Sequence, residues 1–344
     1  MDDVARLPRN DRLDLFTASA GRRGISPIVV EKDFWVCWTL QRVFALQNPP
    51  ASLVFKGGTS LSKVWGVIDR FSEDVDLSFN RDQLGFGGES DPALAASGKQ
   101  RIRMLEKLVD TCISMIRDQF LPQLREAIAK ALGESTQEWS LEIDADDPQA
   151  ILFHYPSSST RGASAGMGYL RPLVKLELGA RNEHWPSEAA TIRSFASEDF
   201  PNLFAQPHAS VTVVSAERTF WEKVTILHRW HHAGPDRPLR DRQSRHYFDV
   251  YKLYQSEIGQ RALANPDLLR SVAQHQEVVF AAKWANYAEA VPGTLRIIPP
   301  PELLRRLKQD YVQMREMIFG TPPTFEQIME ALLALEDAVN ASTT

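Results

Sequence analysis

The order of short patterns between residues 52 and 79 constrains the fold more than any other feature. Ser52–Phe55 is a β-prone run, and two adjacent glycines, Gly57 and Gly58, follow it. Asp74–Phe79 alternates strictly between polar and apolar residues, which is typical of a half-buried strand. Between them, apolar residues recur at helical spacing: Leu61, Val64, Trp65 and Ile68. This stretch is therefore predicted to form a strand, a glycine turn, a helix and a second strand.

The rest of the chain divides into a mixed part and a helical part. Further strands are predicted near residues 139–143, 150–154, 173–178 and 211–214. Helices are predicted for residues 28–40, 101–131, 215–231, 244–255, 301–318 and 324–340. Residues 83–99 are expected to form a long loop, and residues 157–166 a flexible hairpin or lid. The expected fold class is α/β (α+β), with a mixed-sheet domain over 1–214 and a helical domain over 215–344.

Composition excludes several classes of protein. The chain has 344 residues, of which 43% are hydrophobic and 24% charged, as in ordinary globular proteins. No apolar run approaches the roughly 18–20 residues that cross a bilayer, and we expect no membrane contact. Only two cysteines occur, Cys37 and Cys112, so a disulfide framework is excluded and a cytoplasmic location is expected. The net charge of −5 means that any nucleic-acid contact requires a local basic patch.

The alternating strand carries two carboxylates on one side. Residues two apart on a strand face the same way, so Asp74 and Asp76 project together, away from Val75 and Leu77. Mg²⁺ is commonly held by one or two carboxylates plus substrate phosphates, which makes this pair a candidate metal site. The alternative is a solvated sheet edge, which an isolated Asp-x-Asp usually is.

The preceding turn strengthens the metal interpretation. Gly57 and Gly58 let the backbone approach a ligand closely, the start of the next helix offers amides to an anion, and Thr59 and Ser60 add hydroxyls. A tight connection is the alternative for the glycine pair alone. A phosphate-binding turn joined by one helix to a carboxylate strand provides both requirements of nucleotidyl transfer, a triphosphate site and a metal site.

Several segments together resemble one protein family. Lys56–Lys63, with the sequence Lys-Gly-Gly-Thr-Ser-Leu-Ser-Lys, and Arg70–Leu77, with the sequence Arg-Phe-Ser-Glu-Asp-Val-Asp-Leu, resemble the first motif of the AbiEii/AbiGii toxin family. These are nucleotidyltransferase-like proteins of the DNA polymerase β superfamily. The resemblance extends over most of the chain, to residues 31–35, 175–178, 217–223 and 245–249.

The resemblance implies a function as well as a fold. It implies a polymerase β-like nucleotidyltransferase core that uses Mg²⁺ or Mn²⁺ and a nucleoside triphosphate. The residues expected to bind the nucleotide are Lys56, Gly57, Gly58, Thr59, Ser60, Lys63 and Lys223. It further implies the toxin of a toxin–antitoxin or abortive-infection system, with a separately encoded antitoxin protein. RNA is the expected acceptor, and the 3′ end of tRNA is the first one to test.

A third carboxylate is expected on a neighbouring strand. Lys175 and Glu177 alternate with Val174 and Leu176, which on its own is equally typical of a plain amphipathic strand. Polymerase β-like enzymes often use a third acidic residue, which completes the metal site and accepts the proton of the attacking hydroxyl. Glu177 is therefore expected to join Asp74 and Asp76 as a catalytic residue and metal ligand.

Two further catalytic residues are expected in the helical domain. Lys223 shares one side of its helix with Phe220 and Leu227, where a lysine can also lay its stem on apolar surface and keep its ammonium in water. The resemblance favours contact of Lys223 with nucleotide phosphate, and it places Asp249 in a functional segment. The alternative for Asp249 is surface pairing with Arg245 and Lys252 at helical spacings.

A basic, histidine-containing stretch joins two of the predicted helices. Its arginines suit phosphate and suggest an RNA-docking surface, although a solvated loop is the favoured alternative because Asp236 and Asp241 intervene. These arginines are Arg229, Arg237, Arg240, Arg242 and Arg245. His228 and His231 lie three apart, but no third ligand stands at a recognisable spacing, so zinc is disfavoured.

The expected function is metal-dependent transfer of a nucleoside monophosphate to an acceptor hydroxyl. Two other classes stay open. The same site can transfer nucleotide to a protein hydroxyl, or the chain can be a non-catalytic module that binds nucleotide or a partner.

Overall fold

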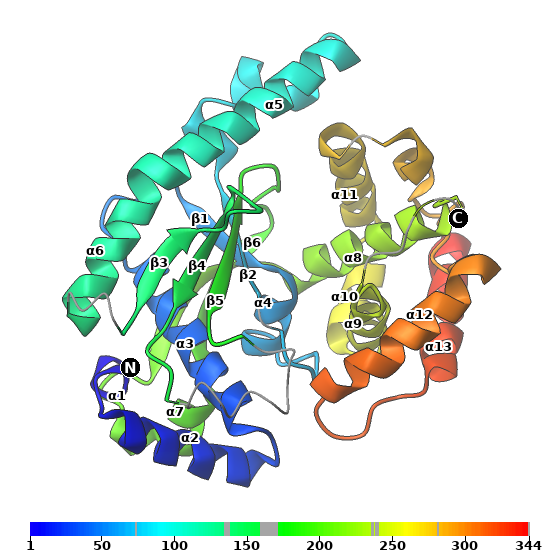
Figure 1. Ribbon diagram of the computed structural model, residues 1–344. Coiled ribbons are helices and arrows are strands. Elements are labelled where there is room, and N and C mark those ends of the chain that lie inside the picture. Colours follow the sequence, from blue (N-terminus) through cyan, green and yellow to red (C-terminus); the bar gives the residue numbers. More distant parts are fainter. Residues whose placement is uncertain are drawn as a thin grey trace. The chain divides into compact units, whose positions relative to one another are not determined.

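The computed structural model describes residues 1–72, 74–133, 138–158, 171–234, 237, 241–280 and 282–342 (Figure 1). The predicted hairpin or lid at 157–166 lies outside the described residues from position 159 onward. The chain forms two compact units. The first contains Met1–Val64, Ser72–Ser90 and Arg103–Val214, and the second contains Trp65–Phe71, Asp91–Ile102 and Ser215–Thr344. The two short segments of the second unit fall within the expected 1–214 domain.

One mixed sheet forms the centre of the first unit. Within the described residues it has seven strands in the order β3-β4-β5-β2-β1-β7-β6. Strand β2 is antiparallel to β1 and parallel to β5, and β1 is parallel to β7. The strands are β1 (Leu53–Lys56), β2 (Asp74–Phe79), β3 (Ser140–Ile143), β4 (Ala150–His154), β5 (Val174–Gly179), β6 (Ser187–Arg193) and β7 (His208–Val214). The expected α/β fold class with a mixed sheet is confirmed.

Helices with buried apolar residues pack against the sheet. Helix α3 has large apolar side chains on every side, and Phe34, Trp35 and Trp38 are completely buried, which explains its dense apolar sequence. It packs against strands β5 and β7. The helices of this unit are α1 (Asp2–Ala5), α2 (Arg9–Arg23), α3 (Pro27–Phe44), α4 (Gly57–Lys63), α5 (Gly98–Met115), α6 (Leu121–Leu132) and α7 (Phe195–Asp199). Helix α5 begins in the segment Asp91–Ile102, which belongs to the second unit.

Two predicted elements differ from the structure. The helix after the glycine turn begins at Gly57 and ends at Lys63, so the prediction that it reaches Ile68 is wrong. Gly66 adopts a positive φ of 59°, which a continuing helix does not allow. The predicted loop at 83–99 contains short 3₁₀ turns at Arg81–Leu84, Gly88–Ser90 and Pro92–Leu94, and α5 already begins at Gly98.

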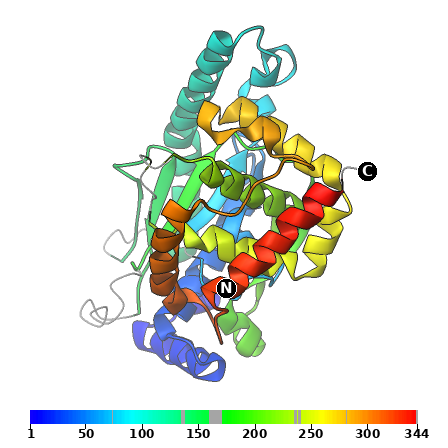
Figure 2. The same ribbon diagram turned by 90° about the vertical axis from the view of Figure 1, so that its right-hand side faces the viewer.

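The second unit is helical, as its sequence predicts (Figures 1 and 2). Helix α9 packs against α8, α10, α12 and α13 and so contributes to much of the core of this unit. The helices are α8 (Ala216–His231), α9 (Ser244–Tyr254), α10 (Glu257–Leu263), α11 (Pro266–Val279), α12 (Pro301–Met314) and α13 (Phe325–Ala341). Ser215 caps α8, and Thr324 begins α13 with a capping box. Among the helices described, none is both long and apolar enough to span a membrane.

Candidate active site

The glycine turn lies directly against one of the two predicted carboxylates. Strand β1 ends at Lys56, and α4 begins at the next residue, Gly57, whose φ is +77°. A Cβ at this position would lie 2.0 Å from Oδ2 of Asp76. The backbone of the turn therefore occupies space beside the carboxylate that only a glycine leaves open.

Paired residues on three neighbouring strands place charged groups on one face of the sheet. Asp76 is the register partner of Lys56 on β1 and of Glu177 on β5, and Asp74 is the partner of Lys175. Residues paired in register point to the same face. Both aspartates are partly exposed, whereas Val75 and Leu77, which point to the opposite face, are buried. The structure thus brings Lys56, Asp74, Asp76 and Glu177 to one face, as the alternating pattern predicts for the two aspartates.

The two hydroxyl residues of the turn donate to backbone carbonyls, Thr59 to the start of β2 and Ser60 within the turn itself. Thr59 Oγ1 donates a hydrogen bond to the carbonyl oxygen of Asp74 at 2.5 Å and approaches that of Ser72 at 3.3 Å. Ser60 Oγ donates to the carbonyl oxygen of Gly57 at 2.8 Å. Both side chains are buried. These contacts favour a structural role for the hydroxyls, and the binding of phosphate by Thr59 and Ser60 stays a prediction.

Glu177 has a cationic neighbour on its own strand. Lys175 Nζ lies 3.3 Å from Glu177 and 3.4 Å from Asp144, and both carboxylates raise the pKa of Lys175 against the opposite effect of its partial burial. Among the residues that the structure describes, no three or more His, Cys, Asp and Glu side chains are grouped so as to hold a metal ion. The binding of Mg²⁺ by Asp74 and Asp76, with substrate phosphates and water as the remaining ligands, stays a prediction.

Lys223 and Asp249 meet in the interior of the second unit. Lys223 Nζ lies 2.8 Å from Oδ2 of Asp249, whose side chain is completely buried. Arg70 binds the same carboxylate in bidentate fashion, with Nε and Nη2 each 2.7 Å from an oxygen. The alternative of a surface pair with Arg245 and Lys252 is therefore wrong for Asp249, because burial and two other cations define its environment.

Charge balance explains the ionisation of this group. Burial would raise the pKa of Asp249, but the adjacent Arg70 and Lys223 outweigh it and hold that pKa far below its usual range. Burial lowers the pKa of Lys223, and Arg70 lowers it further, while Asp249 opposes both effects. The carboxylate is thus ionised and holds the lysine in a fixed position.

Sequence reasoning assigned no role to Arg70. It belongs to the segment Trp65–Phe71, which connects α4 to β2 in the chain but packs as part of the second unit. The amide of Phe71 donates to the carbonyl of Met317 at 2.8 Å, and that of Phe319 donates to the carbonyl of Asp69 at 2.7 Å. No local spacing connects Arg70 with Asp249, because 179 residues separate them.

The basic, histidine-containing stretch is partly explained by packing. His228 accepts a hydrogen bond from the amide of Arg296 through Nδ1 and contacts the carbonyl of Asn286 through Nε2. Arg237 stacks on Trp284 with its guanidinium 4.0 Å from the ring centroid. Arg240 lies outside the described residues. The expected RNA-docking role of these arginines stays a prediction.

The mixed sheet, the glycine turn and the aspartate pair define a candidate nucleotidyltransferase. A protein-family model described as "Nucleotidyl transferase AbiEii toxin, Type IV TA system" matches residues 38–331. The chain therefore belongs to the AbiEii family of nucleotidyltransferase toxins of type IV toxin–antitoxin systems, which confirms the family resemblance and the nucleotidyltransferase class.

The chain also resembles a solved structure of a nucleotidyltransferase toxin. The chain is similar to MenT4, a nucleotidyltransferase toxin from Mycobacterium tuberculosis H37Rv, with 13% sequence identity and a TM-score of 0.37. The similarity covers 90% of this chain and 99% of the MenT4 chain. No curated protein matches the chain.

Proposed function

We propose that the chain transfers a nucleoside monophosphate from a nucleoside triphosphate to an acceptor hydroxyl, with Asp74 and Asp76 as ligands of Mg²⁺ or Mn²⁺. The observation that carries this proposal is the contact between the glycine turn and Asp76. Because residue 57 has no side chain, the backbone of the turn can lie directly beside the carboxylate that is proposed to hold the metal ion. The family membership supports the reaction class, and this contact supports the proposal that the site lies in the first unit.

Each of the site residues in the first unit is assigned a separate role in the transfer reaction. A bound divalent ion would neutralise charge on the phosphates and favour attack at the α-phosphorus. The acceptor oxygen forms a bond to the α-phosphorus, the bond from that phosphorus to the bridging oxygen breaks, and pyrophosphate leaves. We assign acceptance of the hydroxyl proton to Glu177, which shares the face and register of Asp76. Lys56, the other register partner of Asp76, is assigned to charge neutralisation of the phosphates.

In the second unit, Lys223 is proposed to contact nucleotide phosphate. Asp249 is proposed to act with it by holding the lysine ammonium, and Arg70 by keeping Asp249 ionised. A lysine fixed by a buried carboxylate loses little conformational freedom when an anion binds, which favours binding. Together, Arg70, Lys223 and Asp249 carry one net positive charge, which attracts the phosphates.

We propose RNA, and first the 3′ end of tRNA, as the acceptor. The family's place in type IV toxin–antitoxin systems supports growth-inhibiting modification of an essential molecule and a separately encoded antitoxin protein that counteracts it. A triphosphate substrate and an RNA acceptor are both available in the cytoplasm, where we propose that the protein acts.

The test is incubation with Mg²⁺, total RNA and each of the four nucleoside triphosphates, radiolabelled at the α-phosphate. The wild-type protein is expected to label RNA, and Asp76→Ala is expected to abolish labelling. Asp146→Ala, which removes an exposed carboxylate from a loop of the same unit, is the matched control and is expected to retain activity. Label in polypeptide would establish a protein acceptor instead. Nucleotide binding without labelled product, or equal labelling by Asp76→Ala, would contradict the proposal.

A further inference from the structure

Lys63 is held in a buried ion pair at the far end of the helix that carries the glycine turn. Helix α4 begins at Gly57 and ends at Lys63, whose Nζ lies 2.7 Å from Oδ1 of Asp33 on α3. Only 6% of the Lys63 side chain and 4% of the Asp33 side chain are exposed. The ammonium of Lys63 also lies 4.2 Å from the ring centroid of Phe195, the first residue of α7.

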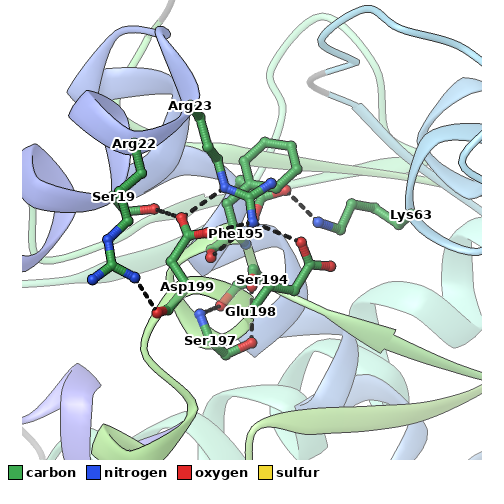
Figure 3. Close-up of polar contacts among 10 residues, drawn as sticks. Ser19, Arg22, Arg23, Lys63, Ser194, Phe195, Ser197, Glu198 and Asp199 are labelled. Carbon is green, nitrogen blue, oxygen red and sulfur yellow. Dashed lines mark hydrogen bonds and ion pairs between the residues drawn. The ribbon is translucent and has the colours of Figure 1, made fainter.

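Further polar contacts hold the residues around Lys63 in place (Figure 3). The second oxygen of Asp33 accepts a hydrogen bond from the amide of Phe195 at 2.6 Å. Helix α7 is tied to α2 through Arg23, which lies 2.7 Å from Asp199 and 2.9 Å from Glu198 and places its guanidinium 4.5 Å from the ring of Phe195. Helices α3 and α7 thus contact the end of α4, and α2 in turn contacts α7.

Electrostatic attraction favours the ion pair of Lys63 with Asp33. Burial would lower the pKa of Lys63, but the charge of Asp33 outweighs it and raises that pKa. Removing a buried ammonium from its carboxylate leaves two uncompensated buried charges, which is strongly unfavourable. The pair of Lys63 and Asp33 carries no net charge, whereas Arg70, Lys223 and Asp249 together carry one positive charge, so a phosphate that recruited Lys63 would have to replace its carboxylate.

Because α4 is short, the ion pair at Lys63 also limits the movement of the Gly57 turn at the other end of the helix. Seven residues of α-helix extend over only about 10 Å, so the two ends of α4 move together as a short rigid rod. At the Gly57 end there is no spare room, because even one added carbon would overlap Asp76. A shift of the Lys63 end therefore changes how the turn meets the carboxylate.

We propose that Asp33 and Lys63 are positioning residues whose ion pair fixes α4, so that the Gly57 turn keeps its place against Asp76, and that Lys63 does not itself bind phosphate. This inference rests on the proposed function of the turn and assigns a different role to Lys63 from the nucleotide contact expected from the resemblance. Asp33 was quoted in that resemblance without any role. The sequence signal for Asp33 is a run of three charged residues, Glu31 to Asp33, inside a mostly apolar and buried helix.

The two roles of Lys63 make opposite predictions for Asp33→Asn. If Lys63 is a phosphate ligand, Asp33→Asn releases its ammonium and leaves the KM for the nucleotide unchanged or lower, whereas Lys63→Met raises it. If the pair is an anchor, both single variants raise the KM by about tenfold, and the double variant is no worse than either one, because both remove the same interaction. The KM is taken for whichever of the four nucleoside triphosphates gives the most labelled product.

The KM separates positioning from loss of folded protein. A smaller folded fraction lowers the apparent kcat and leaves the KM unaltered, so a purely structural defect would change only kcat. Lys63→Arg, which keeps the ion pair, is expected to restore the KM to within about twofold of the wild-type value. Arg117→Met removes an exposed ion pair of the same unit, with Asp118, and is expected to leave both constants unchanged.

A second measurement covers variants that are too weakly active for kinetics. The dissociation constant for radiolabelled ATP, measured by filter binding with Mg²⁺, is expected to follow the same pattern in the wild-type protein, the two single variants Asp33→Asn and Lys63→Met, and the double variant. A raised constant in Lys63→Met with a normal one in Asp33→Asn would overturn the anchor in favour of a phosphate contact. Normal constants in both would overturn it altogether. Failure of the proposed function itself is recognised separately, by undiminished transfer in Asp76→Asn.

Discussion

The backbone of Gly57 and the carboxylate of Asp76 lie so close that a Cβ on residue 57 would be 2.0 Å from Oδ2. The two residues are separated by a helix and a connecting segment in the sequence, yet neighbouring strands bring them together, because Lys56 and Asp76 pair in register. The turn and the carboxylate strand therefore act as one structural feature.

Gly57→Ala is expected to abolish transfer. The added methyl group both strains the backbone at a φ of +77° and collides with Asp76, so the turn and the carboxylate must move apart. Gly85→Ala is the matched control, since Gly85 has a φ of +86° but open space around it. It carries a backbone cost of about 1–2 kcal/mol and no collision. Equal activity in the two variants, assayed at equal concentrations of folded protein, would show that the contact with Asp76 is unimportant.

Glu177→Gln is expected to reduce kcat by about 10²- to 10⁴-fold, in keeping with the loss of a general base. The KM for the nucleotide is expected to change little, because Glu177 is assigned to the proton and not to the phosphates. Glu142→Gln removes an exposed carboxylate from β3 of the same sheet and is the control. A rise in KM without a fall in kcat would instead indicate that Glu177 contributes to substrate binding.

Arg70→Met is expected to destabilise the protein by about 3–5 kcal/mol, because the buried Asp249 loses its bidentate partner. Lys252→Met removes the exposed pair with Asp69 and is expected to cost no more than about 1 kcal/mol. Urea unfolding followed by tryptophan fluorescence measures both. A cost for Arg70→Met as small as that for Lys252→Met would show that Asp249 is not held as the structure describes.

His228 is expected to make the protein less stable in mild acid. Burial lowers the pKa of its imidazole from about 6.5 to about 4, with a further lowering by His231 and His232. The neutral ring is the folded form, since Nδ1 accepts a hydrogen bond from the amide of Arg296. Its contribution to stability is therefore complete above pH 6.5, falls as the pH drops from 6.5 to about 4, and does not change further below that.

The slope approaches about 1.4 kcal/mol per pH unit for the one proton taken up on unfolding. His228→Gln is expected to remove this component. The measurement is the difference in unfolding free energy between the two proteins across the pH range. A difference that does not vary with pH would contradict the neutral assignment.

Local pattern in the sequence predicted much of the sheet. The bounds of β2 and β4 agree with the prediction residue for residue, because alternation of polar and apolar side chains reports directly which face is buried. Strand β6 was missed because its only buried residue is Ile192, so it shows no alternation. The helix after the turn was extended too far because apolar spacing continues to Ile68 beyond the bend at Gly66.

The ion pairs around the site could not be predicted in this way. Thirty residues separate Asp33 from Lys63, and 179 separate Arg70 from Asp249. Periodicity shows that a charged residue lies on an apolar face, as it did for Lys223, but it does not show which distant charge compensates it. Such pairs depend on tertiary packing, which the local pattern of the sequence does not report.

The central claim is tested most directly by comparing a nucleoside triphosphate labelled at the α-phosphate with the same nucleotide labelled at the γ-phosphate, for the wild-type protein and Asp76→Asn. The account predicts that wild-type protein passes only the α-label to the acceptor, releases the γ-label as pyrophosphate, and loses transfer in the variant. Passage of the γ-label to the acceptor, or undiminished transfer of the α-label by Asp76→Asn, would contradict it.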